Sequence, residues 1–169
     1  MWLATRGVLY YIVSCFLLFA GIPWLIRRLD AYLPNLAFGW VGPWAGGVIF
    51  VVALAVYTVC AFWLMAAGRG PYIEFDPPTQ LVCTGPYRRC RNPVAAAVLI
   101  AILGEAVFFS SPALLALFLL GMPVAHAQAV LLEEPLLKRR FGAVYDAYCQ
   151  EVPRWLPQRS RATDPGRSS

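Results

Sequence analysis

The chain has 169 residues, of which 60% are hydrophobic and only 14% are charged, and its formal net charge is +5. This composition excludes an ordinary soluble domain of this size, and the length supports a single domain. The basic residues lie beside apolar stretches and not on a soluble basic face, so they indicate membrane lipids as partners and exclude nucleic acid.

Two apolar stretches in the first part of the chain predict membrane spans. Residues 8–26 have about the 20 residues needed to cross a hydrocarbon core. Tyr10, Tyr11 and Trp24 near the ends of this stretch are typical of an interfacial aromatic belt. Residues 44–67 form a second stretch without a charge. We expect residues 1–67 to be an N-terminal two-helix membrane anchor.

The cysteines give no sign of a disulfide framework or a metal site. They stand at positions 15, 60, 83, 90 and 149, form no CxxC pair, and in two cases fall inside apolar stretches. We therefore expect no bound metal.

Polar chemistry is concentrated between the second and third spans, in the segment TGPYRRCRNP at residues 84–93. Pro86 and Pro93 predict an ordered turn that feeds a helix beginning at Pro93. Three arginines and the unpaired amide hydrogens of a helix start would together attract anionic or electron-rich groups. Membrane topology alone also explains the arginines, but it leaves Tyr87 and Asn92 unexplained.

Two further apolar stretches follow, at residues 94–109 and 113–132, and the short break between them predicts an antiparallel hairpin. Glu105 lies in the middle of the third stretch. It is either bonded to a neighbouring helix or it lines a cavity, and the sequence leaves both interpretations open. His126 lies near the end of the fourth stretch. A lone histidine there is more often a helix-packing residue than a catalyst, and the sequence leaves both interpretations open.

After the fourth stretch, Glu133, Glu134 and Pro135 indicate the start of another helix. Apolar side chains recur there at intervals of three and four as far as Tyr148, which predicts an amphipathic helix. The two carboxylates have two readings, an ion pair with the arginines of the polar segment or ligand binding. The last residues, 158–169, have little to bury and are predicted to be disordered.

These elements predict an all-α, polytopic membrane protein with about four transmembrane helices, a cytoplasmic cofactor loop and a C-terminal amphipathic helix. Residues 68–157 would form its functional core. The distribution of Lys and Arg predicts a location in the cell membrane with both termini in the cytoplasm.

The sparse polar inventory favours a chemistry that needs little acid, base or metal assistance. Methyl transfer from a sulfonium donor is a displacement on an already activated carbon, so the protein can contribute mainly positioning and exclusion of water. We therefore expect no dedicated catalytic side chain.

The motifs GPYRRCRNP and LLEEPLLKRRFGAVYDAYCQEVPRWLP, separated by a short apolar hairpin, resemble the isoprenylcysteine carboxyl methyltransferase family, which is related to phospholipid methyltransferases. The resemblance covers roughly residues 72–157. It implies S-adenosyl-L-methionine as cofactor, bound at the cytosolic edge, and a tunnel that admits a lipophilic acceptor. The cofactor contacts that it implies are Thr79, Gln80, Leu81, Val82, Tyr87, Asn92, Pro93, Val94, Ala95, Glu133 and Glu134.

Three residues depart from the family pattern. Asn92 stands where eukaryotic members have histidine, and Ala95 stands where a tyrosine is common. Ala129 occupies the position of an arginine that holds the substrate carboxylate in the prenylcysteine enzymes. We therefore expect a different small lipophilic or lipid-like acceptor. Two alternatives are a nicotinamide-dependent membrane reductase of related fold and a non-catalytic membrane protein that keeps the fold.

Overall fold

The structure is a computed structural model that describes residues 2–68 and 79–156, and within these ranges the regular elements are all helical. The tail at residues 158–169, which is predicted to be disordered, lies outside the described residues, as do residues 69–78 of the predicted functional core. The first half contains α1 (Trp2–Phe16), the π-helical turn η1 (Leu17–Gly21), α2 (Ile22–Ile26), the 3₁₀ turn η2 (Arg27–Tyr32) and α3 (Val41–Gly68). The second half contains the 3₁₀ turn η3 (Gly85–Arg88), α4 (Pro93–Phe108), α5 (Pro112–Gln128), the π-helical turn η4 (Ala129–Glu133), α6 (Glu134–Phe141) and α7 (Ala143–Glu151).

Within the described residues, three continuous helical stretches are long and apolar enough to cross a membrane: Gly7–Tyr32, Val41–Gly68 and Pro112–Phe141. The helix α4 is equally apolar but has only 16 residues. The predicted all-α membrane fold is therefore confirmed. Of the four apolar helices expected, three reach the length of a span on their own, because a helix rises only about 1.5 Å per residue.

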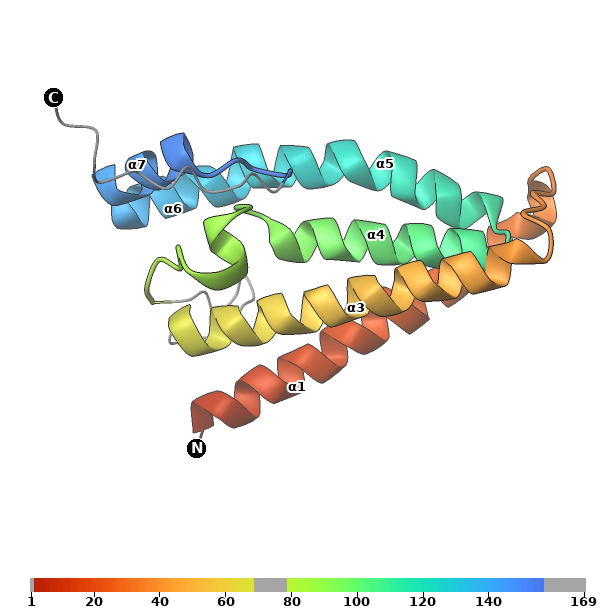
Figure 1. Cartoon of the computed structure of the whole chain (residues 1–169), viewed down its shortest axis with the longest axis horizontal. Coiled ribbons are helices and arrows are strands. Elements are labelled where there is room, and N and C mark those ends of the chain that lie inside the picture. The colour runs from red at the N-terminus through yellow and green to blue at the C-terminus, as the bar shows by residue number, and fades with distance from the viewer. Residues whose placement is uncertain (1, 69–78, 157–169) are drawn as a thin grey trace, which may run out of the picture.

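The helices α3 and α4 lie side by side at the centre of the molecule, with α5 next to α4 and α1 crossing α3 (Figure 1). Small residues allow α3 and α4 to approach closely. A Cβ atom added to Gly46 would lie 2.6 Å from the carbonyl oxygen of Gly104, and one added to Gly104 would lie 2.7 Å from the amide nitrogen of Phe50. Contacts of this kind are the usual way in which helices pack where lipid removes the hydrophobic driving force.

At one end of the molecule a carboxylate organises the start of α5. Asp30 Oδ1 accepts hydrogen bonds from Ser111 Oγ (2.8 Å) and from the amide of Ala113 (3.0 Å). Ser111 Oγ in turn accepts a hydrogen bond from the amide of Leu114 at 3.2 Å, which makes Ser111 the N-cap of α5. The predicted break between the third and fourth apolar stretches is therefore held in place by the loop that follows α2.

The predicted helix start near Pro135 is confirmed, since α6 begins at Glu134 with Pro135 in its first turn, but no break separates this helix from α5. From Pro112 to Phe141 the chain is continuously helical, because η4 joins α5 directly to α6. Pro135 has no amide hydrogen and would normally clash with a carbonyl one turn earlier. The wider π-helical turn immediately before it, with the amide of Glu134 bonded to the carbonyl oxygen of Ala129, relieves this conflict. The break falls instead at Gly142, whose φ of 55° suits glycine.

The start of α1, the polar segment that contains η3, and the helices α6 and α7 lie at one end of the bundle (Figure 1). The connection after α2 and the turn between α4 and α5 lie at the other end. This arrangement gathers most of the polar motifs found in the sequence at a single end.

Candidate functional site

The residues that precede the polar segment lie between two apolar clusters. Val82 is buried with Cys60 and Tyr87, against α3. Its neighbours Leu81 and Cys83 pack instead against a second cluster that contains Tyr145 and Tyr148 of α7. Alternation of this kind follows from extended backbone, in which successive side chains point to opposite sides. The segment therefore joins α3 to α7.

The turn η3 is fixed by a glycine and by an aromatic ring. Gly85 has a φ of 59°, which disfavours other residues, and a Cβ atom at this position would overlap the indole ring of Trp63. Trp63 Nε1 also donates a hydrogen bond to Thr84 Oγ1 at 3.2 Å. The predicted ordered turn is confirmed, and its position against α3 depends on the absence of a side chain at Gly85.

Two buried tyrosines connect η3 to its neighbours. Tyr148 Oη donates a hydrogen bond of 2.6 Å to the carbonyl oxygen of Tyr87, and Tyr87 Oη donates one of 3.4 Å to the carbonyl oxygen of Cys60. Burial raises the pKa of both phenols above its ordinary value, so both groups stay protonated and can donate at physiological pH. The turn is thus held from α3 on one side and from α7 on the other.

An ion-pair network closes the C-terminal segment over the polar segment. Arg154 binds Glu134 in a bidentate manner, with Nε to Oε1 at 2.6 Å and Nη2 to Oε2 at 2.9 Å. Arg91 Nη1 donates to Glu134 Oε1 at 3.0 Å and to Cys149 Sγ at 2.9 Å. The hydrogen bonds to Glu134 raise the pKa of Arg154 above its ordinary value. We name Arg91, Glu134 and Arg154 the arginine–glutamate clamp.

Backbone contacts reinforce the clamp. The amide of Arg91 donates to the carbonyl oxygen of Pro153 at 2.9 Å, and the amide of Asn92 donates to that of Arg154 at 3.2 Å. The thiol of Cys90 donates to the carbonyl oxygen of Trp155 at 3.1 Å. The two amide bonds tie the residues just before α4 to the C-terminal segment, and the thiol bond adds a third link.

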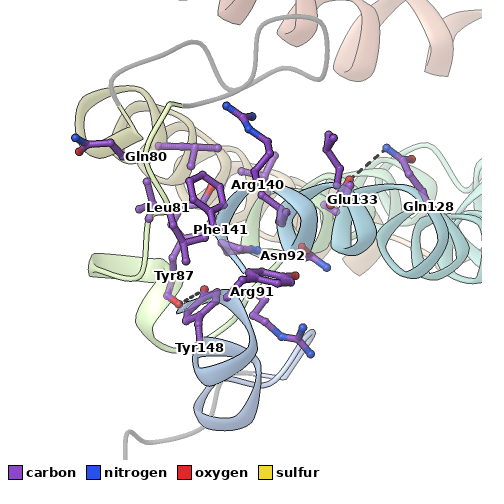
Figure 2. Close-up of a pocket in the computed structure, with 18 of the residues that line it drawn as sticks. Gln80, Leu81, Tyr87, Arg91, Asn92, Gln128, Glu133, Arg140, Phe141 and Tyr148 are labelled. Carbon is purple, nitrogen blue, oxygen red and sulfur yellow. Dashed lines mark hydrogen bonds between the residues drawn. The ribbon is translucent and has the colours of Figure 1, made fainter. Parts of the chain in front are cut away.

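The two consecutive glutamates play different structural roles, since consecutive residues of a helix point about 100° apart. Glu134 belongs to the clamp, whereas Glu133, the last residue of η4, lines a cavity and accepts a hydrogen bond from Gln128 Nε2 at 3.4 Å. A π-helical turn contains one residue more than an α-helical turn and so changes the faces on which neighbouring residues lie. Figure 2 shows Glu133 beside Gln128 in this cavity.

The cavity has a volume of about 630 Å³, within the range of sites that hold small molecules and cofactors. Nine of the eleven residues predicted to contact the cofactor line it: Gln80, Leu81, Val82, Tyr87, Asn92, Pro93, Val94, Ala95 and Glu133. In Figure 2, Leu81 and Tyr87 lie on one side of the site, Glu133 lies on the other side, and Asn92 lies between them.

Thr79 and Glu134 are not among the residues that line the cavity. The amide of Thr79 donates to the carbonyl oxygen of Gly68 at 2.9 Å, and its hydroxyl group donates to the same oxygen at 3.2 Å, so Thr79 ties the chain to the end of α3. Ala129 is buried at the start of η4, and Ala95 leaves space in the cavity wall.

Sequence reasoning did not assign the other residues that line the cavity, and these fall into three groups. Arg91 belongs to the cationic motif, and Phe141, Tyr145 and Tyr148 belong to the periodic pattern of the amphipathic helix, so both patterns could have indicated them. Gln128, Leu136, Leu137 and Arg140 lie near Glu133 in the chain. The third group comes from the predicted anchor, where no sequence pattern indicated a role in a site: Ser14, Leu18, Tyr57 and Leu64.

His126 and Glu105 have different environments. His126 Nδ1 accepts a hydrogen bond from Trp155 Nε1 at 3.1 Å, which agrees with its interpretation as a packing residue. Glu105 is buried on α4 and does not line the cavity, and within the described residues its Oε2 has no hydrogen-bond partner. Arg88 and Arg89 are exposed beside the site.

The cavity wall carries both signs of charge. Glu133 provides a carboxylate, whereas Arg91 and Arg140 provide guanidinium groups. Among the residues that the structure describes, no partner is present for the buried Nε atom of Arg91. A buried donor of this kind is satisfied when an acceptor atom of a ligand reaches it. The described ranges contain no group of three or more His, Cys, Asp or Glu placed to hold a metal ion.

Comparison with known proteins places the chain in a family. It is 27% identical over 124 residues to the nickel-cobalt-cadmium resistance protein NccN of Alcaligenes xylosoxydans xylosoxydans, covering 72% of this chain and 55% of that protein. It is 26% identical over 134 residues to the cobalt-zinc-cadmium resistance protein CzcN of Cupriavidus metallidurans, covering 76% of this chain and 59% of that protein. The matches thus span little more than half the length of these curated relatives. No solved structure matches.

The sequence profile of the phospholipid methyltransferase family matches residues 41–144, which is more than half of the chain and includes α3, the polar segment, α4, α5 and α6. This family is part of the isoprenylcysteine carboxyl methyltransferase-like group of membrane methyltransferases, so the resemblance inferred from the motifs is confirmed. The chain belongs to the phospholipid methyltransferase family.

Proposed function

We propose that this protein is an S-adenosyl-L-methionine-dependent methyltransferase that methylates a lipophilic or lipid-like acceptor at the edge of the cell membrane. The observation that carries the proposal is the meeting of Glu133 with the segment around Asn92 in one cavity, although 41 positions separate them in the chain. Membership of a methyltransferase family supports the reaction class.

The residues of the cavity suit the chemical groups of this cofactor. The Glu133 carboxylate can accept hydrogen bonds from a ribose diol or pair with an ammonium group. The side-chain amides of Gln80 and Asn92 can both donate and accept, as a purine edge requires. The guanidinium groups of Arg91 and Arg140 suit a carboxylate. The neighbouring Leu81, Val82 and Phe141 offer apolar surface for the remaining atoms.

The bound donor would supply an electrophilic methyl group, whose bond to sulfur breaks, with the electron pair left on sulfur, as a lone pair of the acceptor bonds to the carbon. The protein's own contribution is placement. Tyr87 and Asn92 belong to the polar segment and Glu133 belongs to η4, and the clamp holds these two segments together, while the tyrosine pair ties the polar segment to α7. Such rigid placement of two reactants supplies most of what an activated displacement needs. We assign no general base or acid.

The experiment that tests this function is methyl transfer from the isotope-labelled donor to lipids. The detergent-purified protein is incubated with labelled S-adenosyl-L-methionine and total membrane lipids, and the extracted lipids are separated and counted. We expect label in one lipid fraction, and much less of it with the Asn92→Ala variant. A variant of the exposed Arg89, Arg89→Ala, serves as control and should retain activity. Absence of label in every fraction, with a correctly folded protein, would contradict the proposal.

A further inference from the structure

The first span, predicted as an anchor, contributes directly to the cavity wall. Ser14 of α1 and Leu18 of η1 line the cavity together with Tyr57 and Leu64 of α3. The family profile begins only at residue 41, so Ser14 and Leu18 come from outside the matched region, whereas Tyr57 and Leu64 lie inside it. The part of the cavity bounded by Ser14, Leu18, Tyr57 and Leu64 is called the apolar arm below.

Contacts between side chains fix α1 against α3 at this arm. Ser14 Oγ and Tyr57 Oη share a hydrogen bond of 2.8 Å, and Tyr11 Oη and Thr58 Oγ1 share one of 2.7 Å. The ring of Phe19 packs edge-on against that of Tyr57, with 5.1 Å between the ring centroids. Specific side-chain contacts therefore hold the first span against α3 where the two line the cavity.

The first span departs from α-helical geometry at the point where it lines the cavity. Leu18 lies in η1, a π-helical turn, and the cavity is flanked on its other side by the π-helical turn η4, which carries Glu133. Turns of this kind inside longer helices occur frequently at functional sites. Both interruptions of the helical geometry thus contribute a residue to the same cavity.

The arm suits the apolar part of an amphiphile. Leu18 and Leu64 present hydrocarbon. The hydroxyl of Ser14 donates to the carbonyl oxygen of Tyr11 at 2.9 Å and accepts from Tyr57 Oη, so both hydroxyl donors are already paired and an apolar chain can cover them without leaving a donor unpaired. Leu64 and Tyr57 are seven positions apart on α3, which corresponds to about 10 Å along the helix axis. Glu133, Asn92 and Gln80 supply the polar part of the cavity wall.

We propose that α1 is part of the acceptor site, and that Leu18 and Ser14 contact the apolar chain of an amphiphilic acceptor whose methyl-accepting group lies in the polar part of the cavity. This inference rests on the proposed function for the identity of the reaction. According to this proposal, α1, which lies outside the region matched by the family profile, helps to select the apolar chain of the acceptor.

The first test is photochemical labelling of the unmodified protein. The full chain is reconstituted into phosphatidylcholine nanodiscs with a single-chain ethanolamine phospholipid that carries a diazirine near the end of its chain, and labelled peptides are identified by mass spectrometry. We expect labelling of the peptide that contains Ser14 and Leu18, and suppression of this labelling by an excess of the same lipid without diazirine. Labelling that is spread over the lipid-facing surface and unaffected by the competitor would overturn the inference.

The second test compares two adjacent leucines. Leu17 is exposed and does not line the cavity, so Leu17→Trp is the matched control for Leu18→Trp, which fills the arm. We expect Leu18→Trp to reduce the competable labelling about tenfold, the scale on which an apolar pocket discriminates chains, while Leu17→Trp leaves it unchanged. Equal labelling of the two variants would overturn the inference.

A calorimetric titration with S-adenosyl-L-methionine accompanies both tests. Loss of labelling with cofactor affinity intact shows that Leu18→Trp is folded and that the arm binds the chain. If the unmodified protein binds no cofactor but is labelled at Ser14 and Leu18, the proposed function fails while the binding of an amphiphile at α1 stands. If the cofactor binds but the competable labelling avoids α1, the inference about α1 fails while the proposed function stands.

Discussion

Glu133 and Glu134 are adjacent in the chain but contact different parts of the molecule. Glu134 holds two arginines through short hydrogen bonds, whereas Glu133 lines the cavity. The sequence predicted both as cofactor contacts and left an ion pair open. It could not show which of the two faces the cavity, because this depends on the helical phase after the π-helical turn η4, and a run of apolar residues carries no distinct pattern for such a turn.

Replacement of Glu134 by alanine is expected to destabilise the protein. Arg91 and Arg154 would then lose their shared carboxylate while remaining largely shielded from water, and the free energy of unfolding should fall by about 2 kcal/mol. Thermal unfolding in detergent measures the change. Asp146→Ala is the control, because its ion pair with Lys138 is exposed and worth at most about 1 kcal/mol. Equal losses from the two variants would contradict the structural role of the clamp.

Gly85 provides a second prediction for a single residue. In Gly85→Ala the new methyl group would meet the ring of Trp63 in a backbone conformation that alanine disfavours, so the turn must shift. We expect weaker cofactor binding as well as a lower unfolding temperature. Gly39→Ala is the matched control, because Gly39 also has a positive φ but has no atom within 4 Å of the added Cβ. The explanation fails if cofactor affinity changes to the same extent in both variants.

Among the elements, the apolar helices could be predicted from the sequence and the joint at η4 could not. The lengths of the apolar runs located α3, α4 and α5 closely, since a membrane requires continuous hydrogen-bonded backbone. The continuation of α5 into α6 was missed because Pro135 normally ends a helix. The contribution of α1 to the cavity was missed because its apolar pattern is the same for a lipid-facing helix and for one that lines a pocket.

The close contact between α3 and α4 leads to a prediction about two adjacent glycines. Gly46→Ala should reduce the free energy of unfolding by about 1 to 3 kcal/mol, because its Cβ would press on the backbone of α4. Gly47→Ala should be nearly neutral, since a Cβ there lies 3.6 Å from the ring of Phe108. The free energy of unfolding of each variant is measured by titration with a denaturing detergent. Similar values for both variants would show that the two helices are not packed as described.

At the scale of the whole molecule, the polar motifs gather at one end of the helical bundle and the Asp30 connection lies at the other (Figure 1). The sequence could predict this because the spans alternate in direction and the basic residues concentrate on one side. What it could not predict is the closure of the C-terminal segment over the polar segment, which depends on backbone hydrogen bonds between residues more than 60 positions apart, such as Arg91 and Pro153.

The proposed orientation in the cell membrane gives a further prediction. A fluorescent protein that folds only in the cytoplasm should fluoresce when fused to either end of the chain, because the basic residues near both ends favour the cytoplasmic face. A phosphatase that is active only outside the cytoplasm should be active when inserted after Asn35. The reverse pattern would place the site on the outer face, away from cytosolic cofactor, and would contradict the proposed orientation.

The most direct measurement is a calorimetric titration of the purified chain with S-adenosyl-L-methionine. We expect saturable binding at one site per chain, weakened about tenfold or more by Glu133→Ala, equivalent to about 1.4 kcal/mol. Glu151→Ala, which removes an exposed carboxylate at the end of α7 outside the cavity, should bind as the unmodified protein does. No binding by the folded protein, or equal binding by the Glu133 variant, would contradict the assignment of this cavity to the cofactor.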